Sequence, residues 1–126
     1  MCARQEISGI SDRLKIKAET IDTLVSELSG GNQQKVQIAR WLEAGVDILL
    51  LVDPTRGVDV GARSEITRIW IELAGAGAAI LIVSSDAEEI SEVCDRAMVF
   101  RHGSIAKELS ADELSEHALL QHAAGQ

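Results

Sequence analysis

Two short runs of consecutive apolar residues stand out along the chain, Ile48–Val52 and Ala79–Val83. The first run is bounded by Asp47 on one side and by the pair Asp53-Pro54 on the other. Short, continuous apolar runs of this kind are typical of strands that are buried on both faces of a parallel sheet. The pattern therefore predicts two buried strands.

Helical periodicity occupies the segment between the two predicted strands. Four apolar residues recur there at the spacing of one helix face: Ile66, Ile69, Trp70 and Leu73. This spacing predicts a helix over 62–74. A further helix is predicted over 33–43, where the apolar residues lie on mixed faces.

Two serine–glutamate pairs downstream have the spacing of a capping box, in which each side chain bonds to the backbone amide of the other residue. Ser85 with Glu88 and Ser110 with Glu113 therefore predict two more helix starts. Between them, two short runs flank the tripeptide Arg-His-Gly and predict a β-hairpin around Gly103. The resulting order of strand, helix, strand, helix, hairpin and helix indicates an α/β domain with a partly parallel sheet.

Composition narrows the class of protein. The 126 residues are enough for one small domain with a core, and the net charge is −8 without a stripe of Lys and Arg, which argues against nucleic-acid binding. Cys2 and Cys94 are too few for a disulfide framework, so we expect a reducing compartment and a core position for Cys94. The longest apolar run is shorter than the roughly 20 residues that span a bilayer, so we expect a cytoplasmic protein without direct membrane insertion.

The segment Leu28–Leu42 (LSGGNQQKVQIARWL) contains the first candidate chemistry. Two glycines allow a ligand to approach the backbone closely, and the amides that begin a helix favour an anion. Ser29 adds a hydroxyl donor next to Gly30 and Gly31. Such a segment can hold a phosphate without lysine, although an isolated Ser-Gly-Gly is usually only a turn before a helix.

Two later segments change this assessment. They are ILLLVDPTRGVDVGAR and, after one helix, ILIVSSDAEEISEVCDRAMVFRHGSI. Together with LSGGNQQKVQIARWL they resemble the nucleotide-binding domain of ABC transporters, and most of all the second ATPase module of bacterial monosaccharide importers of the ribose, galactose and xylose type. The resemblance covers residues 26–109. It implies an α/β, partial P-loop NTPase fold with parallel strands, flanking helices and a C-terminal β-hairpin.

The P-loop pattern, Gly-x4-Gly-Lys-Ser/Thr, is absent because the sequence contains no Gly-Lys pair. The resemblance places that loop upstream, so we expect the C-terminal half of such a domain. It divides the chain into three parts: the end of a helical subdomain with its connection (1–27), the signature helix, Walker-B-like strand, switch region and hairpin (28–109), and a C-terminal helix and tail (110–126).

The resemblance also assigns roles around the nucleotide. In this family, ATP lies between two domains, and one of them contributes the signature segment across the interface. We define that segment as residues 29–33, and its members are expected to contact ATP held by a partner domain: Ser29, Gly30, Gly31, Asn32 and Gln33. Asp59 is expected to contact the second ATPase domain. It could also cap the following helix, and both roles can hold together.

The catalytic positions depart from the family pattern. Val52 falls on the Mg²⁺-organising aspartate and Asp53 on the catalytic glutamate, and valine has no oxygen ligand for a hard cation. A one-residue deletion would instead make Asp53 the metal aspartate. Asp53 is therefore the candidate catalytic residue, unless it is a turn residue before Pro54. Ser85 falls on the switch histidine, or it simply caps a helix.

The resemblance implies ATP and Mg²⁺ as cofactors of an intact assembly, with a second ATPase domain and a transmembrane permease as partners. That assembly would lie at the inner face of the cell membrane. With one carboxylate and the histidine missing, we expect slow hydrolysis or none, because a positioned base commonly supplies about 10²- to 10⁴-fold in rate. The alternative hypotheses are a non-catalytic interaction module and a decayed, truncated gene product.

Overall fold

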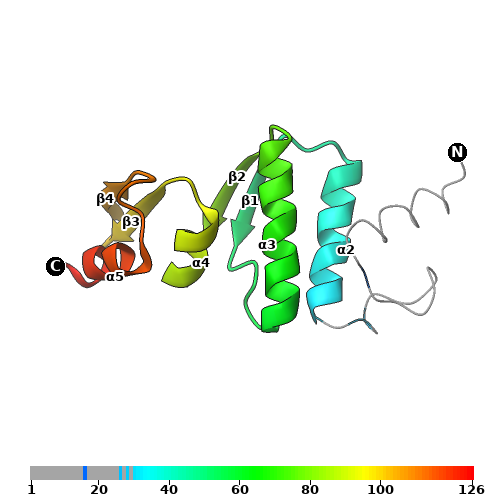
Figure 1. Ribbon diagram of the computed structural model, residues 1–126, viewed down its shortest axis with the longest axis horizontal. Coiled ribbons are helices and arrows are strands. Elements are labelled where there is room, and N and C mark those ends of the chain that lie inside the picture. Colours follow the sequence, from blue (N-terminus) through cyan, green and yellow to red (C-terminus); the bar gives the residue numbers. More distant parts are fainter. Residues whose placement is uncertain (1–15, 17–25, 27, 29) are drawn as a thin grey trace, which may run out of the picture. The chain divides into compact units, whose positions relative to one another are not determined.

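A computed structural model describes residues 16, 26, 28 and 30–126 of the chain (Figure 1). Ser29, the predicted phosphate-binding serine, lies outside the described residues. The chain divides into two units, Met1–Leu81 and Ile82–Gln126, and each unit is described by itself.

The first unit contains two helices that pack on each other and a strand pair. In chain order the elements are α2 (Gly30–Glu43), β1 (Ile48–Val52), α3 (Val60–Gly75) and β2 (Ala79–Val83), whose last residues cross into the second unit. β1 and β2 form a two-stranded parallel sheet, as the helical connection between them requires. Both predicted strands are therefore confirmed at their expected bounds, and so is the α/β fold.

Local signals explain why α3 begins and packs as it does. The Asp59 carboxylate accepts a hydrogen bond from the Ala62 backbone amide at 3.0 Å and caps the helix. Ile66, Ile69 and Trp70 are buried at the predicted spacing. α3 begins two residues before the predicted start, because Asp59 supplies the N-terminal cap, and it ends one residue beyond the predicted end.

Burial of the strands differs from the prediction of two covered faces. In β1 only the side chains of Leu49 and Leu51 are buried, whereas Ile48, Leu50 and Val52 are 71%, 63% and 65% exposed. β2 is covered still less, since its residues alternate between exposed and half-buried and none of them is buried. The prediction was wrong because a continuous apolar run does not encode which of its faces another layer covers.

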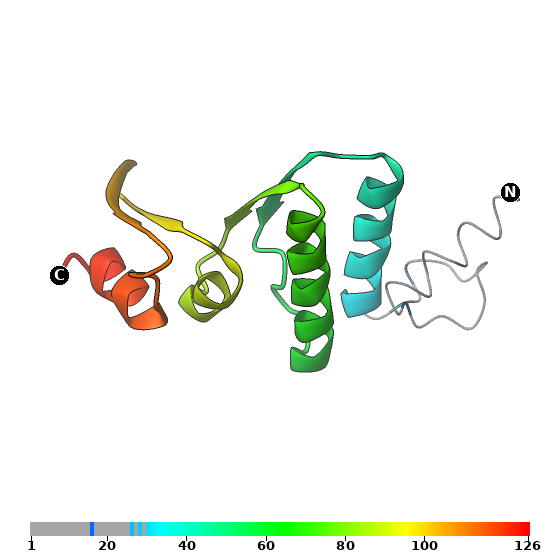
Figure 2. The same cartoon turned by 45° about the horizontal axis from the view of Figure 1, so that its top comes forward.

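The second unit contains α4 (Ala87–Val93), β3 (Ala97–Arg101), β4 (Ser104–Leu109) and α5 (Glu116–Ala124). β3 and β4 pair antiparallel, and their tight connection is visible in Figure 2. His102 and Gly103 both have positive φ, at 50° and 79°, which suits a two-residue hairpin turn. The predicted hairpin around Gly103 is therefore confirmed.

Two predicted helix caps were wrong: the cap of α4 lies one residue after the predicted Ser85, and α5 is capped by Ser115, five residues after the predicted Ser110. α4 is capped by Asp86, whose carboxylate accepts from the Glu89 amide at 3.1 Å, and not by Ser85. Aspartate and serine cap helices about equally well, so neighbouring residues compete for the role. Ser110 and Glu113 do bond to each other, with the Ser110 amide donating to Oε2 at 3.2 Å, but they close a turn.

The core of the second unit lies between the hairpin and its two helices. Its buried members are Ile90, Ala97, Val99, Leu109 and Leu119. Cys94 is half-buried and packs against this cluster, and burial raises the pKa of its thiol, with smaller contributions from Asp95 and Glu89.

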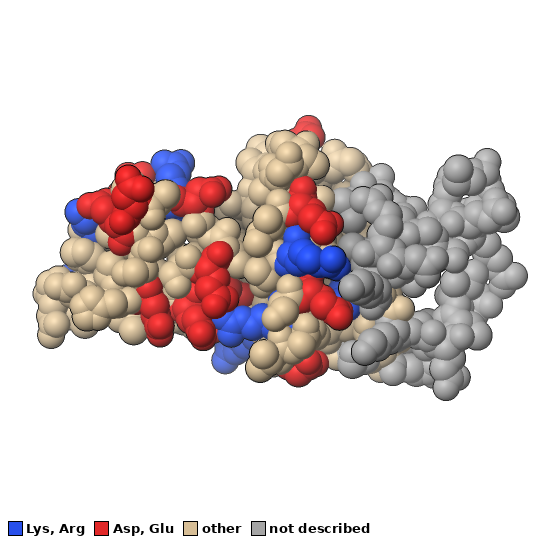
Figure 3. Space-filling model, in the orientation of Figure 1, with Lys and Arg blue, Asp and Glu red and all other residues tan. Residues whose placement is uncertain are grey.

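On the face drawn in Figure 3, the Lys and Arg side chains of the described residues are scattered among acidic ones and form no basic stripe.

Candidate functional site

The described part of the signature segment forms the first turn of α2. Gly30 begins this 14-residue helix and is exposed, and the first turn, as described from Gly30 onward, has no acidic side chain. A Cβ placed on Gly30 would meet no described atom within 4 Å. The first amides of a helix have no partner within that helix and carry its positive dipole end. Gly30 therefore presents an open backbone that suits an anion.

Gly31 is buried, and glycine is needed at this position for a different reason from that at Gly30. A Cβ placed on it would lie 2.5 Å from Cβ of Ala62 and 3.6 Å from Cγ1 of Val58. Real carbon atoms do not approach to the shorter of these distances. Glycine at this position therefore allows the first turn of α2 to pack directly on the first turn of α3.

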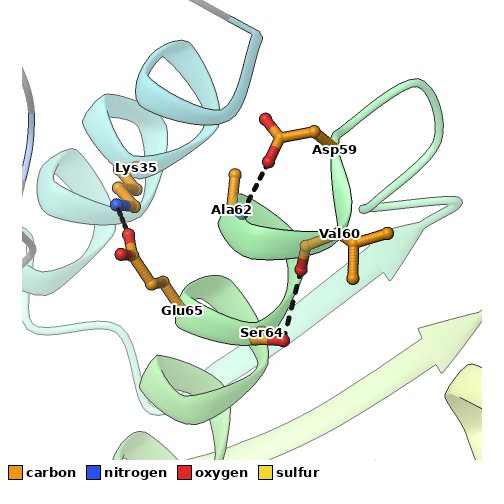
Figure 4. A network of polar contacts seen from close by, with 6 residues as sticks. All are labelled: Lys35, Asp59, Val60, Ala62, Ser64 and Glu65. Atoms are coloured by element: carbon orange, nitrogen blue, oxygen red, sulfur yellow. Dashed lines mark hydrogen bonds and ion pairs between the residues drawn. The ribbon is translucent and has the colours of Figure 1, made fainter.

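One helical turn further along, an ion pair joins the same two helices. Lys35 Nζ bonds to Glu65 Oε2, as Figure 4 shows, and both side chains have additional interactions. The Lys35 side chain is 3% exposed and that of Glu65 is 35% exposed. The sequence does not predict this pair, because the two residues are 30 positions apart and Glu65 belongs to none of the segments that carry the family resemblance. The available signal was the position of Lys35, four residues after Gly31 on the same helix face.

Asp59 lies at the start of α3, next to the residues that Gly31 contacts. Its carboxylate caps the helix through Ala62, and its carbonyl accepts from the Arg63 amide at 2.8 Å. The predicted capping role is therefore confirmed. Asp59 itself is exposed, and the neighbouring Val60 is 82% exposed. The expected contact of Asp59 with another domain stays a prediction.

The two polar residues of the signature segment face local structure. Gln33 Nε2 donates to the backbone carbonyl of Leu28 at 3.0 Å. Asn32 is 9% exposed and takes part in interactions of its own. These contacts brace the entry into α2, which fits the supporting role expected for both residues without testing their contact with ATP.

Asp53 directly follows the last residue of β1. Its φ of 43° lies in the left-handed region, which aspartate tolerates better than most residues. Its carbonyl accepts from the Arg56 amide at 3.1 Å, so Asp53 opens a turn, as one of the two hypotheses expected. Strained backbone is also common at functional sites. The catalytic role of Asp53 stays a prediction.

Ser85 is exposed and belongs to the second unit, whereas Gly30, Gly31, Asp53 and Asp59 belong to the first. Within the first unit, the structure brings the described part of the signature segment close to Asp59, because Gly31 of α2 packs on Ala62 of α3. Among the described residues, no group of three or more His, Cys, Asp or Glu side chains could hold a metal ion. No described helix is long and apolar enough to cross a membrane.

A cavity of about 260 Å³ lies near the C-terminal ends of α2 and α3. Its walls include Trp41, Asp47, Leu49 and Leu73. It is distant along both helices from Gly31 and Asp59, so it is not part of the candidate site.

Comparison with known proteins identifies similar sequences and folds. No family model matches the chain. It is 50% identical to a ribose import ATP-binding protein of Rhizobium johnstonii over 93% of the chain, and 48% identical to a putative ribose/galactose/methyl galactoside import ATP-binding protein of Halalkalibacterium halodurans over 90%. The chain spans 23% and 22% of these relatives.

A solved ATP-binding cassette of an ABC transporter, in its ADP conformation, matches the fold with a TM-score of 0.77. The match has 25% sequence identity and covers 97% of this chain and 50% of that cassette. The fold is therefore that of part of an ABC ATPase domain.

Proposed function

Because the chain is homologous to ATP-binding proteins of bacterial ABC sugar importers, we propose that it supplies the signature side of a composite ATP site. In this proposal the nucleotide is held mainly by the P-loop of a second ATPase domain. Ser29, Gly30 and Gly31 contact its γ-phosphate, while Asn32 and Gln33 support the segment. The chain corresponds to the C-terminal half of a second ATPase module.

The observation that carries the proposal is the open start of α2. The backbone at Gly30 is exposed and unobstructed by described atoms, in a turn without acidic side chains. A γ-phosphate placed there would meet helix amides and the positive end of the dipole, which together favour an anion. Gly31 would contact the phosphate through its backbone amide only, because the side of its Cα where a side chain would stand packs on Ala62.

The neighbouring surface suits a partner domain. Asp59 and Val60 are both exposed and adjoin the signature segment through the contact of Gly31 with Ala62. Interfaces combine an apolar centre with a polar rim, and in this proposal Val60 contributes to the first and Asp59 to the second. We therefore place the second ATPase domain over the N-terminal ends of α2 and α3.

Hydrolysis in such a site would be slow or absent. Val52 offers no oxygen ligand to Mg²⁺, and Asp53 is a shorter side chain than the glutamate expected of a catalytic base. Displacements of about 1 Å can cost on the order of 100-fold in rate. ATP and Mg²⁺ would then serve mainly to hold two domains together. Through a permease, the assembly would lie at the inner face of the membrane and support sugar import.

Association tests this proposal. The purified chain is mixed with a P-loop-bearing cassette from a homologous importer, and the complex is measured by analytical ultracentrifugation with Mg·ATP, with Mg·ADP and without nucleotide. ATP-dependent association is the expected result. Equal association in all three conditions would favour a non-catalytic interaction module, and no association in any condition would contradict the proposed function.

A further inference from the structure

We propose that Lys35 is a positioning residue, whose buried ammonium, paired with the half-buried carboxylate of Glu65, fixes α2 in one register on α3. This inference rests on the proposed function, because the register decides where the signature segment lies relative to Asp59. Lys35 itself would not contact the nucleotide. It acts through the helix that carries Gly30 and Gly31.

The first step of the argument is geometric. Gly31 and Lys35 lie four residues apart on α2, and Ala62 and Glu65 lie three apart on α3, so each pair shares one helix face. Gly31 meets Ala62, and Lys35 meets Glu65. Two adjacent points of attachment therefore link these faces, as Figure 4 shows for the ion pair.

The two contacts differ in what they specify. The contact at Gly31 is a close approach of small groups, which permits a short distance between helices but tolerates sliding. An ion pair with a hydrogen bond is directional, and it is lost when one helix slides or rotates. The Lys35 ammonium lies almost entirely out of water, so other positions of the helix would lose that partner without solvation in return.

Because Lys35 is buried, its ion pair can fix the register of the two helices without adding to the stability of the chain. Replacement of a buried ion pair by apolar residues of similar size is often neutral or stabilising, while the pair can specify a single arrangement. Ile38, on the same face of α2, is 1% exposed, so an apolar side chain at position 35 would extend an existing buried stripe. An apolar pair should hold the helices together without fixing their register.

Asp59 shows why register matters to function. It lies three residues before Ala62 and caps α3, so its position follows that of the α3 N-terminus. The signature glycines start α2 one turn before Lys35. A shift of α2 along α3 would therefore move the anion-binding amides relative to the interface carboxylate, although both helices would remain intact.

The decisive variant replaces both charges, Lys35→Met with Glu65→Met. Lys35→Arg is the conservative variant that can keep the pair, and Lys107→Met is the matched control in the second unit, where Lys107 lies 3.9 Å from Glu113. Each variant of the full chain is measured in two ways: urea unfolding, and ATP-dependent association with the P-loop-bearing cassette.

The expected result is a split between the two measurements. The double variant should unfold at the same urea concentration as the wild type or a higher one, yet associate more weakly by roughly 10- to 100-fold, the loss expected when a hydrogen bond to a charged phosphate is no longer formed. Lys35→Arg and Lys107→Met should stay close to the wild type in association. Undiminished association of the double variant would overturn the inference.

A second measurement keeps the inference separate from the proposed function. If the wild type shows no ATP-dependent association, the proposed function fails, and the amide NMR signals of Gly31, Asn32 and Ala62 decide the inference. One set of signals in the wild type and several, or strongly shifted ones, in the double variant would support fixed register. Unchanged signals at both helix starts would overturn it. If the double variant does not fold, the isosteric Glu65→Gln variant undergoes the same comparison.

Discussion

Alanine at Gly31 should destabilise the chain, whereas alanine at the adjacent Gly30 should not. The new methyl at position 31 would lie 2.5 Å from Cβ of Ala62, while the one at position 30 would meet no described atom within 4 Å. Non-bonded carbons prefer about 3.5–4.0 Å, so the two helices must separate by roughly 1 Å to admit the first methyl. Neither glycine has a positive φ, so backbone strain does not enter the comparison.

The magnitude follows from two opposing effects. Overpacking costs about 1–3 kcal/mol. Replacing glycine by alanine inside a helix gains up to about 1 kcal/mol. Gly31→Ala should therefore lower the free energy of unfolding by up to about 3 kcal/mol, with a central value of about 1.5 kcal/mol, and Gly30→Ala should leave it unchanged or raise it by less than about 1 kcal/mol.

Urea unfolding followed by circular dichroism measures both variants. A compensating change supplies the strictest control: Ala62→Gly removes the methyl that Gly31→Ala would strike. The double variant should be more stable than the sum of the two single effects allows, because contacting residues show coupling of about 0.5–3 kcal/mol. Equal stability of the two glycine variants, or strict additivity with Ala62→Gly, would refute the close-packing argument.

Three further predictions concern single side chains. Asp59→Ala should destabilise the chain by about 1 kcal/mol through loss of the α3 cap, whereas Asp59→Asn should keep it, as thermal unfolding will show. Hydrogen bonds from the Ser110 backbone amide and hydroxyl, aided by Lys107, lower the pKa of Glu113 below its ordinary 4.5, and Ser110→Ala should raise it toward that value in an NMR titration. Burial raises the pKa of the Cys94 thiol above 9.0, so in a Cys2→Ser background iodoacetamide at neutral pH should react more slowly with the folded chain than with the urea-unfolded chain.

The sign of the pH effect follows from the direction of each shift. Because the pKa of Glu113 is lowered on folding, its contribution to stability is present above pH 4.5 and is lost as the pH falls through the lower, folded value. For Cys94 the pKa is raised, so stability declines as the pH rises above 9.0. Each assignment would be contradicted by one result: equal stability of Asp59→Ala and the wild type, the same Glu113 pKa in Ser110→Ala as in the wild type, or equal alkylation rates of the folded and unfolded chain.

The elements that could be predicted from the sequence are those with local signals. The apolar runs at Ile48–Val52 and Ala79–Val83 coincide with β1 and β2, and the apolar period of α3 marks its buried face. Cap positions were less certain, because Asp86 follows Ser85 and competes for the same role.

What could not be predicted depends on residues far apart in the chain. Exposure of alternate β1 side chains reflects the absence of a second covering layer among the described residues, which a five-residue run does not encode. The reason for glycine at position 31 lies in Ala62, and Lys35 pairs with Glu65 only because α2 packs on α3. The signature segment marked the site, but the contacts that orient it were visible only in the structure.

The most direct test of the account is the amide NMR spectrum of the chain in the presence of a P-loop-bearing cassette, recorded with Mg·ATP and with Mg·ADP. The account predicts that ATP, and not ADP, shifts the amide signals of Gly30 and its neighbours at the start of α2, and that ATP without the cassette shifts none of them. Shifts of equal size with the chain alone, or an α2 N-terminus that stays unchanged while ATP drives association, would contradict a γ-phosphate contact at the signature segment.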